Sequence, residues 1–242
     1  MDRNYTNVSF FEQRIVTLYG LDSNALKALD LITNVMCIEN GFHRDDGSDY
    51  YTHCVDVANT LLSYGIKDED VICAALLHDI IEDVEGYNRI TLERLFNSNV
   101  ARLVQLLTKE HDVDYHNPEN LAKYIAGIKT DANAAAIKTA DRMHNMMTLN
   151  QKTLESRYRK AIETRDYYLP FFKDCRKKYT RYENLFYAAK AQIEPLIFTI
   201  ETFYAEIRRL NAVIEKTAHN PNMNKKKKNE HKSNQPNKQK PK

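Results

Sequence analysis

His78 and Asp79 interrupt an apolar run at residues 74–81, and two more acids, Glu82 and Asp83, follow at once. The run predicts a buried helix, whose spacing would turn Glu82 toward the same face as the His-Asp pair. Burying an imidazole and three carboxylates is costly unless a partner neutralises them. Any one such residue is more often a hydrogen-bonded core residue than a ligand. Together they favour a metal site.

The remaining sequence predicts helices throughout. No segment alternates with period two, no internal repeat is present, and the chain's six glycines form no Gly-rich phosphate loop. Its length suits one main core with appendages, so we expect an all-α helical bundle. From residue 158 onward the pattern is rich in aromatic residues, with interruptions expected at Pro170 and Pro195. Helical spacing recurs at residues 11–40, 51–64, 91–96, 100–108, 121–128, 134–149 and 158–218.

Charge is divided unevenly along the chain. Residues 225–242 carry eight lysines and one glutamate, so this segment contributes +7 and the rest of the chain −5 to a net charge of +2. A stretch of Lys, Asn, Gln and Pro cannot bury enough surface to fold, so residues 221–242 are predicted to be a disordered basic tail. Without interleaved aromatic residues, a solubilising role is favoured over a contact with nucleic acid.

Nothing in the sequence predicts a membrane span or a secretory signal. The N-terminal residues 1–10 are polar, and no apolar stretch of about eighteen residues occurs. The cysteines are scattered without the close pairs of a zinc knuckle, which predicts reduced thiols. We therefore expect a cytoplasmic protein with thiols at Cys37, Cys54, Cys73 and Cys175.

Two further residues complete a candidate metal site. His53 stands near the start of one predicted helix and Asp141 lies within another, which gives the order His…His-Asp…Asp on three helices. A mixed set of imidazole and carboxylate ligands suits manganese, iron, cobalt or zinc better than magnesium or calcium. Four such ligands leave positions on an octahedral ion for water and substrate.

At these positions the chain resembles the HD superfamily of metal-dependent phosphohydrolases. More narrowly, it resembles the hydrolase domain of RelA/SpoT homologues, which removes pyrophosphate from (p)ppGpp. Departures at Asp49, Cys54 and Met147 remove no expected ligand, and nothing after residue 170 resembles the family's synthetase domain. The resemblance covers roughly residues 20–170 and is carried by residues 44–53, 74–83, 100–109 and 137–146, with a weaker fit at 159–164.

The resemblance implies three parts and a set of site residues. The parts are an HD (p)ppGpp hydrolase-like domain at residues 1–170, a helical extension packing on it at 171–220, and the tail at 221–242. One Mn²⁺, or another divalent transition metal, would be held by His53, His78, Asp79 and Asp141. Glu82 and Asp83 would position or deprotonate the attacking water. The substrate contacts would be Arg44, Lys109, Lys138, Arg142 and Asn145.

By the same resemblance, the chain would hydrolyse the 3′-pyrophosphate of (p)ppGpp to GDP or GTP and pyrophosphate. Ordinary ion pairing around Asp141 is an equal alternative for Lys138 and Arg142. Two other functions stay open: an HD phosphohydrolase for another nucleotide, such as ppApp, NADPH or a cyclic dinucleotide, and an inactive HD-fold regulatory protein. Stand-alone members of the family can serve as antitoxins to an alarmone synthetase. The sequence determines neither that pairing nor whether the chain forms a homo-oligomer.

Overall fold

Helices account for the regular structure of residues 8–218, the part of the chain that the computed structural model describes. Within these described residues, the only β-type pairing is an isolated bridge between His43 and Asp49. The predicted all-α fold is therefore confirmed. The tail predicted at residues 221–242 lies outside the described residues.

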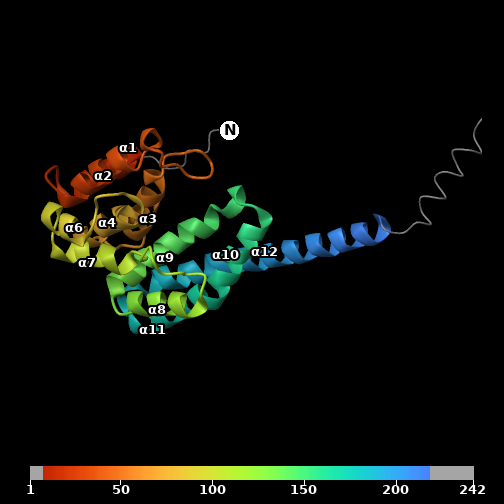
Figure 1. The fold of residues 1–242 in the computed structure, drawn as a ribbon. Coiled ribbons are helices and arrows are strands. Elements are labelled where there is room, and N and C mark those ends of the chain that lie inside the picture. The colour runs from red at the N-terminus through yellow and green to blue at the C-terminus, as the bar shows by residue number, and fades with distance from the viewer. Residues whose placement is uncertain (1–7, 219–242) are drawn as a thin grey trace, which may run out of the picture.

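The helices follow one another from red to blue in Figure 1. The first are α1 (Val8–Tyr19), α2 (Asn24–Val35), α3 (Tyr51–Ser63), α4 (Glu69–Leu76), α5 (Ile80–Asp83), α6 (Arg89–Leu95) and α7 (Ser98–Leu107). The later ones are α8 (Pro118–Ile128), α9 (Ala132–Met147), α10 (Leu154–Glu163), α11 (Leu169–Lys178) and α12 (Glu183–Ala218). Shorter helical segments are η1 (Ile38–Asn40), η2 (Leu149–Gln151), the π-helix η3 (Thr164–Tyr168) and η4 (Thr180–Tyr182).

Side-chain caps determine where the site-bearing helices begin. Asp68 precedes α4 and accepts hydrogen bonds from the amides of Asp70 and Val71. Asp131 precedes α9 and accepts from the amides of Asn133 and Ala134. Each cap satisfies amides that have no partner within the helix. The two caps therefore help to determine the residues at which α4, which leads to His78, and α9, which carries Asp141, begin.

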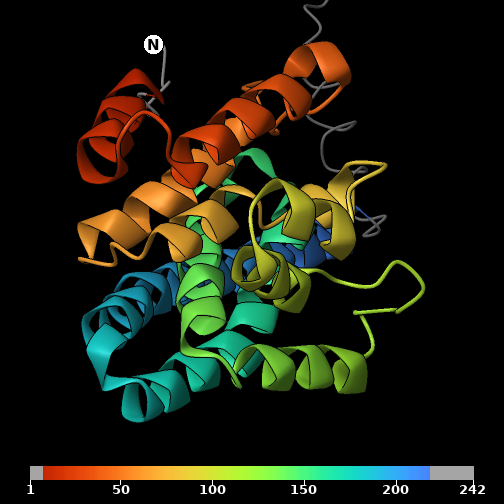
Figure 2. The same ribbon diagram turned by 90° about the vertical axis from the view of Figure 1, so that its left-hand side faces the viewer.

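Helix α9 runs through the middle of the molecule, between the N-terminal helices and α11 and α12 (Figure 2). It packs against α3, α4 and α7 on one side and against α8, α11 and α12 on the other. Residues 134–143 are buried without interruption, and four of these ten are alanines, whose small side chains let the neighbouring helices approach closely. The polar residues on α9 consequently lie within the core.

The structure corrects the predicted continuous helix over residues 74–83. Helix α4 ends at Leu76, α5 begins at Ile80, and the His-Asp pair lies in the turn between them. The His78 Nδ1 atom donates to the carbonyl oxygen of Ala75 over 2.8 Å. In a continuous helix that oxygen would accept from the amide of Asp79, so a side-chain hydrogen bond here takes the place of a backbone one.

The expected interruption at Pro195 is also wrong, since α12 continues through it. A proline in a helix removes the hydrogen bond to the carbonyl four residues earlier. That carbonyl belongs to Ala191, which is exposed, so water can replace the lost donor. Ile193 and Ile197 are buried on either side of the proline and hold the helix on the core. Pro170, by contrast, lies in the first turn of α11, where a proline is tolerated.

The cysteines carry free thiols, as predicted. Cys37 is partly exposed, whereas Cys54, Cys73 and Cys175 are buried. Burial raises the pKa of the Cys54 thiol above its ordinary value, so that thiol stays protonated. Among the described helices, none is both long enough and apolar enough to cross a membrane.

Candidate metal centre

The fold brings the four predicted metal ligands together from three parts of the chain. His53 on α3 and the pair His78 and Asp79 place one ligand atom each within 4.8 Å of one another. Asp141 on α9 joins them, with its Oδ1 atom 3.3 Å from His53 Nε2 and 3.9 Å from His78 Nε2. Both histidines are fully buried. This arrangement of imidazole nitrogens and carboxylate oxygens could hold a divalent metal ion.

The hydrogen bonding of His78 provides a test of whether a metal fits. Because Nδ1 donates to Ala75, a neutral His78 has an unprotonated Nε2. That atom is buried without a hydrogen-bond donor, 3.1 Å from the Asp79 Oδ2 atom. Burial opposes a charged ring, yet the Asp79 carboxylate raises the pKa of His78 well above its ordinary value. When no metal is bound, a proton on Nε2 compensates the nearby carboxylate. A divalent metal bound to the Nε2 lone pair would replace that proton, so these residues fit such an ion.

His53 is oriented by a second histidine. Its Nδ1 atom lies 2.7 Å from Nδ1 of His144, whose Nε2 lies 3.2 Å from an Asp56 oxygen. Burial lowers the pKa of His53 to about 4, so the ring is neutral and has one N–H. If His53 donates through Nδ1, His144 accepts and must donate its own N–H to Asp56. This order leaves His53 Nε2 unprotonated and directed at Asp79 and Asp141.

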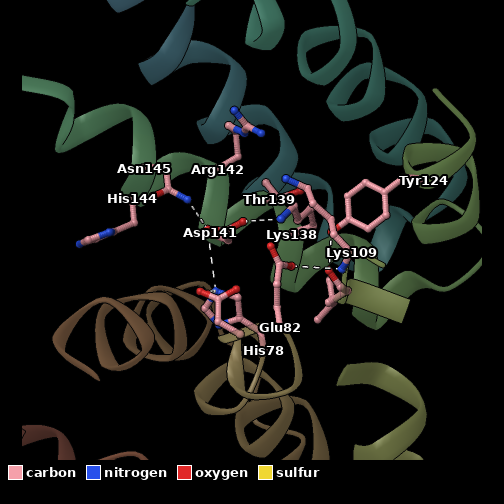
Figure 3. A network of polar contacts seen from close by, with 12 residues as sticks. His78, Glu82, Lys109, Tyr124, Lys138, Thr139, Asp141, Arg142, His144 and Asn145 are labelled. Carbon is pink, nitrogen blue, oxygen red and sulfur yellow. Dashed lines mark hydrogen bonds and ion pairs between the residues drawn. The ribbon is translucent and has the colours of Figure 1, made fainter. Parts of the chain in front are cut away.

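The carboxylates of the cluster are held by donors of their own. Tyr50 donates its hydroxyl to Asp79 Oδ2 over 2.7 Å. Lys138 lies 2.7 Å from Asp141 Oδ2, and Asn145 also donates to Asp141 (Figure 3). Burial disfavours an ionised Asp141, but Lys138 holds the pKa of Asp141 well below its usual range. The carboxylate is therefore ionised and presented to the histidines.

Glu82 and Asp83, the two acids after the His-Asp pair, differ in their hydrogen bonding and in their exposure. Glu82 accepts a hydrogen bond from the backbone amide of Lys109 over 3.1 Å, which fastens it to the segment after α7 (Figure 3). Asp83 lies nearer the surface, and desolvation of its carboxyl group, with the charges of Asp79 and Glu82, raises its pKa to about 6. An acid with a raised pKa beside a metal cluster can accept a proton.

Two of the predicted substrate-binding cations lie over tyrosine rings near the cluster. The Lys109 Nζ atom is 5.5 Å from the centroid of Tyr115 and 5.9 Å from that of Tyr124. Lys138, already paired with Asp141, is 5.6 Å from the Tyr124 centroid. Arg44 contacts other residues. It donates to the Thr148 hydroxyl and lies 5.6 Å from the Tyr50 ring.

Arg142 is directed away from His78 (Figure 3). Its guanidinium is 3.6 Å from the centroid of the Tyr168 ring and donates to Glu163 over 2.8 Å. Only 3% of the residue is exposed. Lys160, to which sequence reasoning gave no role, lies 3.4 Å from the same glutamate, and burial together with Arg142 lowers the pKa of Lys160 to about 8. Arg142 is thus part of a buried ion pair with Glu163.

Sequence reasoning also missed Asp56, which completes the hydrogen-bonded chain behind His53. The signal was its position three residues after His53 on the same predicted helix, which places both on neighbouring parts of one face. The sequence could not show which residue of α9 would meet it. In the structure that residue is His144, which lies between His53 and Asp56.

Comparison with known proteins identifies a family for most of the chain. A family model described as "HD domain" matches residues 28–173. The "GTP pyrophosphokinase rsh" of Brucella ovis is 38% identical over 132 residues, covering 52% of this chain and 17% of that protein. The "Bifunctional (p)ppGpp synthase/hydrolase SpoT" of Escherichia coli is 37% identical over 135 residues, covering 54% of this chain and 19% of that protein.

A solved structure shares the fold. It is described as "A metazoan ortholog of SpoT hydrolyzes ppGpp and plays a role in starvation responses". The TM-score is 0.52 at 22% sequence identity, and the match covers 74% of this chain and 94% of that one. This chain spans only about a fifth of the length of the curated relatives described above.

Proposed function

Since this chain belongs to the HD-domain family, we propose that it is a metal-dependent hydrolase that removes pyrophosphate from the 3′ position of (p)ppGpp. The products would be pyrophosphate and GDP or GTP. The observation that carries the proposal is the buried cluster of His53, His78, Asp79 and Asp141, in which His78 Nε2 has no donor. The name of a similar protein, the bifunctional (p)ppGpp synthase/hydrolase SpoT of Escherichia coli, supports this substrate class.

We assign the metal site to these four residues, with Mn²⁺ as the proposed ion. When bound, such an ion lowers the pKa of a coordinated water and polarises a phosphate oxygen. Each ligand has a supporting contact on the side away from the cluster. His144 supports His53, the Ala75 carbonyl supports His78, Tyr50 supports Asp79, and Lys138 and Asn145 support Asp141. Such supporting contacts orient the ligand atoms and raise metal affinity.

Asp83 is our candidate for the group that accepts the proton of the attacking water. Its raised pKa of about 6 leaves it ionised at neutral pH yet able to take a proton. Glu82 would act as a positioning residue, because its carboxylate is bound to the amide of Lys109. Through this bond Glu82 holds the loop that carries Lys109 beside the site.

We assign the substrate phosphates to Lys109 and Lys138 and the guanine to Arg44. An ammonium near a phosphate oxygen forms a strong charge-assisted contact once water is excluded. The contacts of Arg142 with Glu163 and Tyr168 favour a supporting role behind this site. Asn145 donates to Asp141, so we propose that its main role is to orient that ligand. A contact with the ribose or base of the substrate would be its second role.

The proposal is tested by a metal-supplemented substrate screen on the full chain. With Mn²⁺, Co²⁺ or Zn²⁺, the wild type should release pyrophosphate from ppGpp or pppGpp, and Asp79→Asn should not. Asp174→Asn is the matched control, since Asp174 forms a surface ion pair with Lys129. Preferential turnover of ppApp, NADPH or a cyclic dinucleotide would reassign the substrate. Inactivity with all three metals would contradict the enzyme assignment and favour a regulatory protein.

A cytoplasmic antitoxin role would follow from this activity if the chain removes the product of a toxic alarmone synthetase. Co-expression with such a synthetase tests it: the wild type should restore growth and Asp79→Asn should not. Rescue by both proteins would instead indicate neutralisation by binding.

A further inference from the structure

The second half of α12 presents a row of large apolar side chains to solvent. Figure 1 shows this half of the helix extending beyond the other helices. Phe203 and Ile214 are each 62% exposed, and Ile207 and Leu210 are 38% and 49% exposed. Of the fourteen exposed large hydrophobic residues among residues 8–218, seven lie on α12. Such a concentration on one helix indicates an interaction surface.

The spacing of these side chains is that of a coiled coil. Positions 203, 207, 210 and 214 alternate steps of four and three residues, which keeps them on one narrow face. The same register leads back to Phe186, Ala189 and Ile193, all of which are buried against the rest of the molecule. One apolar seam therefore runs along α12, covered in its first part and uncovered beyond residue 203.

We propose that the uncovered seam of α12, at residues 203–214, pairs with the same segment of a second copy of this chain as an antiparallel two-helix coiled coil. A seam with heptad spacing fits another heptad helix better than it fits a globular surface, because each apolar side chain enters a gap between four others. The flanking residues Tyr204, Glu206, Asn211 and Val213 include a single charge. Two identical helices can therefore meet without like-charge repulsion.

The fold lowers the cost of this pairing. A short helix is normally marginal in water, because its first turn must form before hydrogen bonds repay the loss of chain entropy. Here the first half of α12 is already held on α9, α10 and α11. Tyr158 stacks on Tyr204 at 3.9 Å, and Arg165 pairs with Glu201 over 2.5 Å, just before the seam becomes uncovered. The free segment is thus the continuation of an anchored helix.

Charge favours the antiparallel direction. The sequence after α12 contains the +7 of residues 225–242, whereas the rest of the chain carries −5. A parallel pair would direct two strongly basic segments to the same end. In an antiparallel pair the two ends of α12 that lead into these basic residues lie apart, so the repulsion between like charges is avoided.

The oligomeric state of the full chain tests the pairing. Sedimentation from low to high micromolar concentration should show a dimer for the wild type and a monomer for Ile207→Glu/Leu210→Glu. Ala205→Glu/Ala212→Glu is the matched control, because both alanines are exposed and lie off the seam. Its dimer should persist, and circular dichroism should show that both variants keep their helices. A monomeric wild type, or a dimer that survives the seam substitutions, would overturn the proposal.

A distance between labels tests the direction. Thr217→Cys in a Cys37→Ser background provides one labelling position in each copy near the end of α12. With an antiparallel pairing centred between Ile207 and Leu210, the two labels lie about 25 Å apart along the helices, at 1.5 Å per residue. A parallel pairing would bring them to about 10 Å, and that result would overturn the antiparallel assignment.

Discussion

The Nδ1 atoms of His53 and His144 lie 2.7 Å apart, so one ring must donate a proton to the other. With Asp56 accepting from the far side of His144, the order of donors along this chain of side chains leaves His53 Nε2 unprotonated. His144 and Asp56, which are not metal ligands themselves, therefore leave the His53 Nε2 atom that faces Asp141 free to bind a metal.

Breaking this chain should weaken metal binding before it affects anything else. We expect His144→Phe to lower the affinity for Mn²⁺ by about 10- to 100-fold, because the ligand loses its orienting acceptor. His144→Asn should retain part of the affinity, since its amide can both accept and donate. Titration calorimetry measures both values, with His111→Phe on the exposed loop as control. Equal affinities for His144→Phe and the wild type would contradict the role.

Metal should stabilise the wild type against unfolding. Binding only to the folded state at a hundred times the Kd adds about 2.7 kcal/mol. Asp79→Asn should lose most of this gain, because it removes a carboxylate that faces His78 Nε2 at 3.1 Å. Thermal unfolding with and without Mn²⁺ measures the difference. A similar metal-dependent gain in the variant would place the ion elsewhere.

Asp83 should make the metal-free protein less stable at neutral pH. Its folded pKa of about 6 is raised from 3.8, so between these values the native state binds more protons than the unfolded state. Stability from this group therefore falls as pH rises from 4 to 6. Asp83→Asn should raise the melting temperature at pH 7 and lose that advantage near pH 4. The same substitution should abolish turnover of (p)ppGpp.

Substitution of Lys109 should affect substrate binding, whereas substitution of Arg142 should affect the stability of the fold. We expect Lys109→Met to raise KM by about tenfold, which corresponds to about 1.4 kcal/mol of lost binding, with little change in unfolding. Arg142→Met should instead destabilise the fold by about 3 kcal/mol, because it leaves Glu163 without its closest cation. Urea unfolding and steady-state kinetics on both variants distinguish the roles. The reverse pattern would return Arg142 to the phosphate site.

Local pattern was sufficient for the helices and for the identity of the cluster. Apolar spacing predicted where helices lie, since which face of a helix is buried depends on residues within a turn or two. The same reasoning failed at Pro195, where burial of Ile193 and Ile197 outweighs one lost hydrogen bond. It failed again at His78, where a side chain replaced a backbone donor.

By itself, the sequence determined the helical class of this protein and the residues His53, His78, Asp79 and Asp141 as one candidate set. Only the tertiary structure decided how they are supported, because those contacts join helices far apart in the chain. His144 reaches His53 across 91 residues, and Arg142 turns to Glu163 rather than to the cluster. Periodicity specifies which face of a helix is buried, but the packing of α3, α9 and α10 specifies what that face meets.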